Sequence, residues 1–131
     1  GKIFALLYDQ NCSREEGVFV SFFGRLACTR SGPPRVAMHT GAPVLPVFAE
    51  RLDGGARHRV RIHPALEILP AGDDREAAIR ENARRMTRAI EEEIRRLPDH
   101  WIWGHRRWRT QPKGEPKPYP SRRRSRSRLI R

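Results

Sequence analysis

The stretch IFALLYDQNCSREEGVFVSFFG, residues 3–24, sets the fold expected of this chain. Residues 3–8 are continuously apolar, a pattern typical of a strand covered on both faces, as in parallel sheets. The polar residues 11–16 predict a loop, and the apolar run 18–23 predicts a second strand that ends at Gly24. Asp9 therefore stands at the carboxyl end of a buried strand, which is where open α/β sheets bind their ligands.

Two helices are expected in the remainder of the chain. A pair of consecutive prolines predicts the first turn of a short helix over 35–39, because Pro is tolerated at that point. A longer helix is predicted over 74–97, where apolar residues recur every three or four positions and form one stripe. Asp73, with Glu76 three residues on, resembles a capping box at its start, and Pro98 is expected to end it.

Two more strands are expected between these helices. Residues 44–48 predict a third strand, which Pro46 makes an edge or an irregular strand. Residues 57–62 alternate basic and apolar side chains and predict a fourth strand with one solvated face. The turn at 53–55, Asp-Gly-Gly, predicts that these two strands form a hairpin. The whole order of elements predicts a mixed α/β fold.

Size and charge divide the chain into two expected parts. At 131 residues there is room for one domain, and a hydrophobic fraction of 37% indicates that part of the chain is outside its core. More than half of the net charge of +12 falls in residues 113–131, which contain eight Lys or Arg and one acid. We therefore expect a folded region over 1–112 and a disordered Arg/Ser/Pro-rich tail over 113–131.

The sequence contains no self-sufficient catalytic machinery. No His has an acid five positions later, no Ser lies in a nucleophile elbow, and no Gly-rich phosphate loop is present. Cys12 and Cys28 fit no metal spacing, and reduced thiols are expected there. We accordingly predict no catalytic residue, no metal ligand and no cofactor in this chain. The longest apolar run, 3–8, is far shorter than the about 20 residues that cross a bilayer.

Two short polar segments can bear on function, and each has a plain structural explanation. Asp9 and Asn11 can shape a binding site or can merely cap a turn, while Gln10 can orient a hydroxyl or carbonyl. The segment 101–109, WIWGHRRWR, combines Trp with clustered cations. Arg binds phosphate in bidentate fashion, and Trp favours membrane interfaces or ring stacking. The alternative is a strap that its Trp residues anchor on the core, with the Arg side chains in solvent.

Taken together, these pieces resemble the lipid A biosynthesis acyltransferase family, the late lauroyl and myristoyl transferases of the lysophospholipid acyltransferase superfamily. The resemblance covers about residues 1–112 and rests on four blocks in the family's order: Asp9-Gln10-Asn11; Val20-Ser21-Phe22-Phe23-Gly24 with Ala27 and Thr29; Thr40-Gly41-Ala42-Pro43-Val44 through Val47-Phe48; and Trp101 to Trp108, read as W-x-W-x-H-R-R-W. The tail after Pro112 departs from the family pattern.

The resemblance implies a fold and an activity. The fold is the C-terminal half of a glycerolipid-acyltransferase-like mixed sheet flanked by helices, which would leave a sheet border unpaired. The activity is transfer of a fatty acyl chain from acyl carrier protein to a hydroxyl of a lipid A precursor or related glycolipid. The enzyme would act at the cytoplasmic face of the bacterial inner membrane. The family's His-x4-Asp/Glu motif and membrane anchor precede the part that matches, so the fragment is expected to be inactive alone.

The same resemblance implies which residues bind substrate. In the implied mechanism the family's His deprotonates the acceptor hydroxyl, which attacks the thioester carbonyl, and nearby donors stabilise the oxyanion. Asp9 would shape the acceptor site, and Arg106 and Arg107 could meet sugar phosphates. Carrier protein is acidic, so the basic surface would attract it. The full predicted substrate-binding set is Asp9, Gln10, Asn11, Phe23, Gly24, Thr29, His105, Arg106 and Arg107.

A second function class is a nucleic-acid-binding module that uses the Arg/Ser run 121–128 as its contact. Arg/Ser runs bind RNA, and neutralising phosphates would make that binding steeply dependent on salt. The rest of the chain lacks the aromatic strand motif of common RNA-binding domains, which favours the acyltransferase interpretation.

Overall fold

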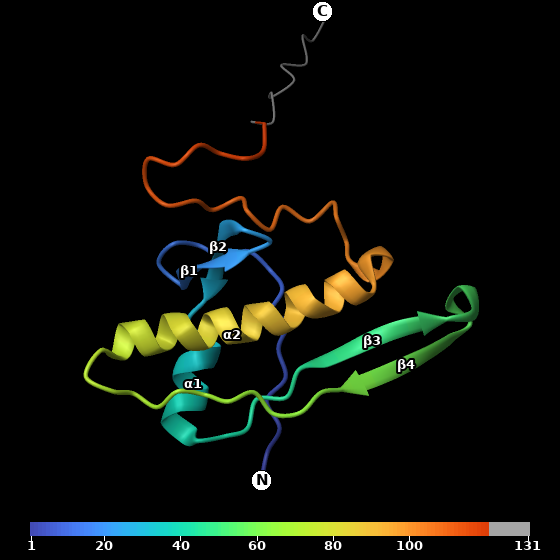
Figure 1. The fold of residues 1–131 in the computed structure, drawn as a ribbon, viewed down its shortest axis with the longest axis horizontal. Coiled ribbons are helices and arrows are strands. Elements are labelled where there is room, and N and C mark those ends of the chain that lie inside the picture. Colours follow the sequence, from blue (N-terminus) through green and yellow to red (C-terminus); the bar gives the residue numbers. More distant parts are fainter. Residues whose placement is uncertain (121–131) are drawn as a thin grey trace, which may run out of the picture.

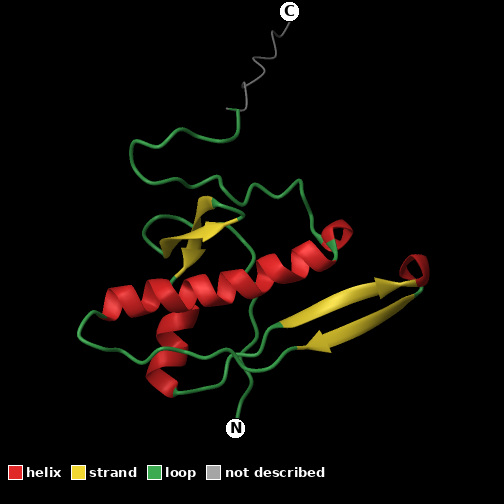
Figure 2. Ribbon diagram, viewed as in Figure 1, coloured by secondary structure: helices red, strands yellow, loops and turns green. Residues whose placement is uncertain are grey.

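The structure of the chain is a computed structural model that describes residues 1–120. Two antiparallel hairpins and a short helix are arranged around one long helix (Figures 1 and 2). The elements are β1 (Gly17–Phe22), β2 (Arg25–Arg30), α1 (Gly32–Thr40), β3 (Val47–Leu52), the 3-10 turn η1 (Asp53–Gly55), β4 (Arg57–Ile62), α2 (Arg75–Arg96) and the 3-10 turn η2 (Pro98–His100). The mixed α/β class predicted from the sequence is confirmed, although the two sheets are separate and each has two strands.

Helix α2 is the element that the others pack against, and its apolar stripe is the one predicted. The buried positions on it include Ile79, Ala83, Met86 and Ile94. The N-cap is Asp74, whose carboxylate accepts a hydrogen bond from the Ala77 backbone N–H at 2.9 Å, so the predicted capping box beginning at Asp73 is wrong by one residue. Helix α2 ends directly before Pro98, as expected.

The β1–β2 hairpin contributes the centre of the core. Its strands pair in the register Val20 with Ala27 and Phe22 with Arg25. Phe22 and Ala27 are buried against Ile94 of α2. The turn between the strands is Phe23-Gly24, and both residues have positive φ, 50° and 75°. Two positive φ angles are the geometry of the type I′ turn, which matches the twist of paired strands.

Hairpin β3–β4 is joined by the Asp-Gly-Gly turn as predicted, but its first strand starts later than expected. Val44 forms only an isolated bridge with Leu66, and β3 begins at Val47, directly after Pro46. Proline has no backbone N–H to donate, so a regular ladder cannot run through position 46. The face of the hairpin turned away from α2 is apolar and exposed, and Val60 and Ile62 are each 65% accessible.

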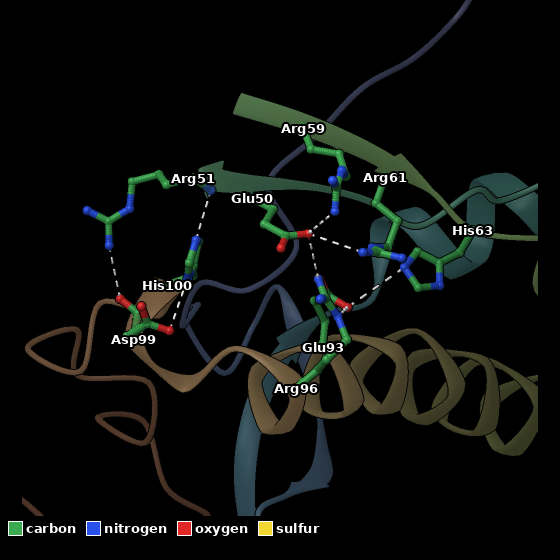
Figure 3. A network of polar contacts seen from close by, with 9 residues as sticks. All are labelled: Glu50, Arg51, Arg59, Arg61, His63, Glu93, Arg96, Asp99 and His100. Carbon is green, nitrogen blue, oxygen red and sulfur yellow. Dashed lines mark hydrogen bonds and ion pairs between the residues drawn. The ribbon is translucent and has the colours of Figure 1, made fainter. Parts of the chain in front are cut away.

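A network of polar contacts joins hairpin β3–β4 to the C-terminal end of α2 (Figure 3). The Glu50 carboxylate lies 3.1 Å from the Arg61 guanidinium and 3.4 Å from that of Arg96. His63 is half-buried, with its ring against Phe48 and its Nε2 3.8 Å from Glu93. The remaining contacts in the network join Arg59 to Glu50, Arg51 to Asp99 and to His100, Asp99 to His100, and Arg96 to Glu93.

The predicted strand at 3–8 is not formed. These residues are irregular in the structure, and the side chains of Ile3 and Phe4 are 98% and 75% exposed. Among residues 1–120 no strand lies alongside them to exchange backbone hydrogen bonds, and a lone apolar segment has no other reason to stay extended. Tyr8 alone in this segment is tied down, by donating its hydroxyl to the Arg30 carbonyl at 2.8 Å. The parallel sheet expected around residues 3–8 is therefore absent from the described part.

Two further expectations concern the short helix and the C-terminal tail. Helix α1 starts at Gly32, three residues earlier than predicted, and Gly41 ends it in the left-handed conformation. Residues 113–120 are irregular, and most of the predicted tail, together with the Arg/Ser run proposed to bind nucleic acid, lies at 121–131, outside the described residues. None of the helices among residues 1–120 combines the length and the apolar composition that a membrane-spanning helix requires.

Candidate functional site

Residues 101–112, which we call the strap, pass back over the β1–β2 hairpin after α2 ends (Figure 1). Two Trp residues hold the strap on the core. The rings of Trp101 and Trp108 lie 5.9 and 5.5 Å from that of Phe22, and the Trp108 indole N–H donates to the Phe22 carbonyl at 3.2 Å. The anchored-strap interpretation of the segment is therefore correct for these two Trp residues.

Asn11 joins the segment before β1 to the strap. Its side-chain amide donates to the Thr110 hydroxyl at 3.0 Å, and its side-chain carbonyl accepts from the Thr110 backbone N–H, also at 3.0 Å. The same amide donates to the Cys12 carbonyl at 3.1 Å, so Asn11 also stabilises the local turn. The Asp-Gln-Asn motif is thus joined to the residue that directly follows the Trp/Arg segment, and we call this pair of hydrogen bonds the clasp.

Arg107 is a buried cation inside the molecule. Its side chain is 1% exposed, and its guanidinium donates to the Cys28 carbonyl and to the Thr29 hydroxyl while lying 5.3 Å from the Phe22 ring centre. Burial lowers the pKa of Arg107, and nearby Tyr8 and Asp9 partly offset that effect. A guanidinium with these partners fixes the strap on β2, and in this arrangement it is closed to a phosphate approaching from solvent.

The two cysteines form a buried thiol pair beneath Arg107. Cys12 Sγ lies 3.5 Å from Cys28 Sγ, both thiols are free, and Gly17 packs directly against both sulfur atoms. Burial raises the pKa of Cys28 to about 12, so its thiol is protonated at neutral pH. A protonated, buried thiol is a poor nucleophile, and this pair therefore belongs to the packing of the site.

The remaining predicted residues of the first and last motifs line the surface beside the clasp. Asp9 and His105 are half-buried, and Gln10 and Arg106 are exposed. His105 Nε2 accepts a long hydrogen bond of 3.5 Å from the Asn11 backbone N–H, which places its ring beside the Asp-Gln-Asn turn. The Arg106 guanidinium lies 5.7 Å from the Tyr119 ring centre. The structure thus brings together Asp9, Asn11, Thr29, His105 and Arg107 around the strap, and Gln10 and Arg106 flank this group in sequence.

Phe23 and Gly24 lie apart from this group, at the turn end of the β1–β2 hairpin. A positive φ is costly for an aromatic residue, and two contacts from α2 hold Phe23 there. The Phe23 backbone N–H donates to the Glu91 carboxylate at 2.9 Å, and the Arg95 guanidinium lies 4.8 Å from the ring centre. The predicted substrate-binding residues therefore form one group and one separate turn.

A polar cleft of about 480 Å³ opens next to the clasp, between residues 13–15 and residues 109–117. Arg14, Arg109 and Lys117 line it, and none of them lies within ion-pair distance of a carboxylate in the described residues. Most Arg side chains of α2, in contrast, are paired with Glu. Arg14 is oriented by donating its Nε–H to the Gln111 carbonyl at 2.8 Å. Glu15 and Glu115 also line the cleft, so its charge is mixed with an excess of cations.

Sequence reasoning missed the residues that hold the site in place. Thr110 and Gln111 directly follow the Trp/Arg motif, and Gln111 is buried with its amide donating to the Leu26 and Trp108 carbonyls. Their position beside a recognised motif was the only available signal. Among residues 1–120, no group of His, Cys, Asp and Glu has the arrangement of a metal site.

Comparisons with known proteins place these features in a family context. The family model described as bacterial lipid A biosynthesis acyltransferase matches residues 1–110. A lipid A biosynthesis palmitoleoyltransferase of Escherichia coli is 32% identical over 108 residues, which are 82% of this chain and 33% of the relative. A lipid A biosynthesis acyltransferase of Haemophilus influenzae is 30% identical over 115 residues, 88% of this chain and 34% of the relative. A lipid A biosynthesis lauroyltransferase of E. coli is 30% identical over 112 residues, 85% and 35% of the two chains. The chain thus spans about a third of the length of these relatives.

Proposed function

The chain belongs to the bacterial lipid A biosynthesis acyltransferase family, and from that membership we propose that it is part of an enzyme that transfers a fatty acyl chain to a hydroxyl of a lipid A precursor or related glycolipid. The observation that carries this proposal is the family match over residues 1–110. It covers the Asp-Gln-Asn turn, the β1–β2 hairpin and the strap as far as Thr110, the three parts that meet around Asn11 and Arg107.

The proposal includes the acyl donor, the location and the complete fold. The donor is acyl carrier protein, whose acidic surface suits a chain with a net charge of +12. The enzyme works at the cytoplasmic face of the bacterial inner membrane. The two hairpins belong to a larger glycerolipid-acyltransferase-like mixed sheet, an idea supported by the exposed apolar face of β3–β4 and by the unpaired edges of both described sheets.

The reaction forms an ester and releases a thiol. The acceptor hydroxyl loses its proton to a base, its oxygen attacks the thioester carbonyl, and the tetrahedral intermediate expels the carrier's thiolate, which takes up a proton. The family's His-x4-Asp/Glu pattern does not occur in this sequence, so the chain by itself is expected to be inactive. Its contribution is to bind and orient the acceptor.

The described residues divide this task between a rigid support and a charged surface. The clasp and Arg107 fix the Asp-Gln-Asn turn against the strap, so that Asp9, Gln10 and His105 can present hydrogen-bonding groups to an acceptor sugar. The unpaired cations of the polar cleft, with Arg106 nearby in sequence, supply charge for phosphate groups on that sugar. Arg107 itself acts by positioning the strap.

A chimera tests the proposal with the chain as it stands. The matched third of the E. coli palmitoleoyltransferase is replaced with residues 1–110, and acyl transfer from acyl carrier protein to a lipid A precursor is measured in membranes. We expect the chimera to transfer acyl groups. In it, Asp9→Ala should lower the rate by roughly tenfold or more, as expected for loss of a substrate-orienting group.

The matched control in the chimera is Asp73→Ala, which removes an exposed carboxylate outside the site and should leave the rate unchanged. A chimera that reaches membranes at normal abundance, resists protease as the parent does and yet transfers no acyl chain would contradict the proposed function. Equal rates for the Asp9 and Asp73 variants would remove Asp9 from the site.

A further inference from the structure

The three Trp residues of the strap do not share one role. Trp101 and Trp108 pack inward on Phe22. Trp103 is 57% exposed, and its neighbour Ile102 is 78% exposed. Anchoring of the strap accounts for the two inward rings and leaves the outward pair without an explanation in the folded domain.

The turn that bears Ile102 and Trp103 is held in a fixed conformation. The Trp103 indole N–H donates to the Pro98 carbonyl at 2.7 Å, and the Trp103 backbone N–H donates to the Trp101 carbonyl at 3.0 Å. The His105 backbone N–H donates to the Ile102 carbonyl at 2.9 Å. Because the only polar group of the indole is already bonded within the protein, what the turn offers to its surroundings is apolar carbon.

The neighbourhood of this turn adds a further aromatic ring and positive charge. The Phe23 ring lies 6.3 Å from the Trp103 ring, which brings the strained β1–β2 turn beside it. The Arg95 guanidinium lies over Phe23 and is paired with Glu91, so it adds little free charge. Arg106, three residues further along the strap, is exposed and has no carboxylate within ion-pair distance among residues 1–120. Aromatic and aliphatic side chains next to cations, on a chain with a net charge of +12, complement a negatively charged bilayer surface.

We propose that the Ile102–Trp103 turn is a membrane-contact wedge, which inserts its two side chains into the interface of an anionic lipid bilayer while the exposed Arg106 meets the headgroups. This inference rests on the proposed function, because it names the surface through which the enzyme would reach a lipid substrate. It also accounts for why the strap carries an outward Trp between two inward ones.

Trp fluorescence tests the wedge in the absence of any acyl donor or acceptor. In the variant Trp101→Phe/Trp108→Phe, Trp103 is the sole Trp of the chain. On adding vesicles of phosphatidylcholine with phosphatidylglycerol, its emission should shift to the blue, and lipids brominated near the carbonyl end of the acyl chain should quench it. The matched variant Trp101→Phe/Trp103→Phe keeps only Trp108, whose emission should stay unchanged.

Co-sedimentation with the same vesicles gives a second readout that retains the native core. The variant Ile102→Ser/Trp103→Ser should weaken binding by roughly tenfold or more, since it removes the apolar area that would enter the interface. The control Val60→Ser/Ile62→Ser alters an equally exposed apolar pair on β4 and should bind like the parent chain.

The inference is overturned if Trp103 is not quenched while the chain is vesicle-bound, if the parent chain does not bind anionic vesicles, or if the β4 control weakens binding as much as the wedge variant does. Should the phenylalanine variants lose their fold by circular dichroism, co-sedimentation of the two serine variants decides alone. Vesicle binding is measured without acyl transfer, so the two proposals can fail separately. An inactive chimera together with normal vesicle binding would contradict the proposed function alone. An active chimera together with loss of vesicle binding would contradict the wedge alone.

Discussion

The two hairpins of this molecule are attached to the same helix by opposite kinds of interaction. Hairpin β1–β2 buries Phe22 and Ala27 against α2, and the strap covers it with Trp101, Trp108 and a buried Arg107. Hairpin β3–β4 buries little and is joined to α2 mainly by the carboxylates of Glu50 and Glu93 and the Arg and His residues around them (Figure 3). The stabilisation that comes from buried apolar side chains depends little on salt or pH. The stabilisation that comes from partly exposed ion pairs is weakened by salt and is lost when acid protonates the carboxylates.

The packed half of the molecule is the half that defines the fold. The β1–β2 hairpin, with the strap and α2, forms a packed unit that also contains the candidate site. The β3–β4 hairpin is an arm that keeps an apolar face open to its surroundings. Substitutions that remove buried groups should therefore affect the first hairpin most, and changes of pH or salt should affect the second.

The largest effect is expected from Phe22→Ala. Phe22 contacts Trp101, Trp108 and Arg107, and its removal leaves a cavity at the centre of the core, so we expect a loss of about 3–5 kcal/mol in the free energy of unfolding. The matched change Phe48→Ala, at a half-buried ring of β3, should cost clearly less. Urea unfolding followed by circular dichroism measures both, and similar losses would break the distinction between the hairpins.

A smaller loss is expected from Arg107→Ala. It leaves the buried Cys28 carbonyl and Thr29 hydroxyl without their donor, and we expect a loss of about 2–4 kcal/mol. The neighbouring change Arg106→Ala, at an exposed side chain, should stay within about 0.5 kcal/mol of the parent. The same urea measurement applies, and a neutral Arg107→Ala would show that the strap is held by its Trp residues alone.

The smallest effect is expected from acid, and it should be confined to β3–β4. Hydrogen bonding to Arg61 lowers the pKa of Glu50, and hydrogen bonding to Arg96 lowers that of Glu93. Because the pKa of each carboxyl is lower in the folded chain than its ordinary value of 4.5, the ionised carboxylates stabilise the attachment of the hairpin at any pH above 4.5. This stabilisation is lost as the pH falls below 4.5 and the carboxylates take up protons.

Backbone amide chemical shifts recorded between pH 6 and pH 3, by nuclear magnetic resonance, check this prediction. The β3–β4 amides should change as Glu50 titrates, while those of β1 and β2 stay nearly constant apart from the Phe23 turn, whose backbone N–H donates to the Glu91 carboxylate. In Glu50→Gln the acid-dependent change should shrink, because one of the two titrating groups is gone. A uniform response of both hairpins, or an unaltered response in the variant, would contradict the assignment of the attachment to these ion pairs.

The sequence predicted the elements whose signals are local. Helix α2 was found from its apolar stripe, and the β3–β4 hairpin from the Asp-Gly-Gly turn, since each pattern is complete within its own segment. Strand β2 was missed because its three consecutive buried residues, 27–29, break the alternation expected of a strand with one buried face. Residues 3–8 were misassigned for the complementary reason: an apolar run indicates a preference for burial, but a strand also needs a neighbouring strand.

The candidate site shows the same division between local and distant information. Asp9, Asn11 and Arg107 could be singled out from their motifs, but the hydrogen bonds between Asn11 and Thr110 join residues that are 99 positions apart. The burial of Arg107 follows from where the strap crosses β2, which no spacing in the sequence reveals. Motif reasoning therefore identified most members of the group and could not distinguish a positioning residue from one that faces solvent.

The contact between Gly17 and the thiol pair restricts the variation that these three positions can tolerate together. A methyl group added at Gly17 would lie 2.5 Å from Cys12 Sγ, 2.7 Å from Cys28 Sγ and 2.9 Å from the Thr29 carbonyl oxygen. Alanine would collide even though the backbone conformation itself would accept it, because sulfur and main chain occupy the space from both sides. A library randomised at position 17 alone should return glycine. Smaller residues at positions 12 and 28 would relieve only the clash with sulfur, because the Thr29 carbonyl oxygen belongs to the main chain.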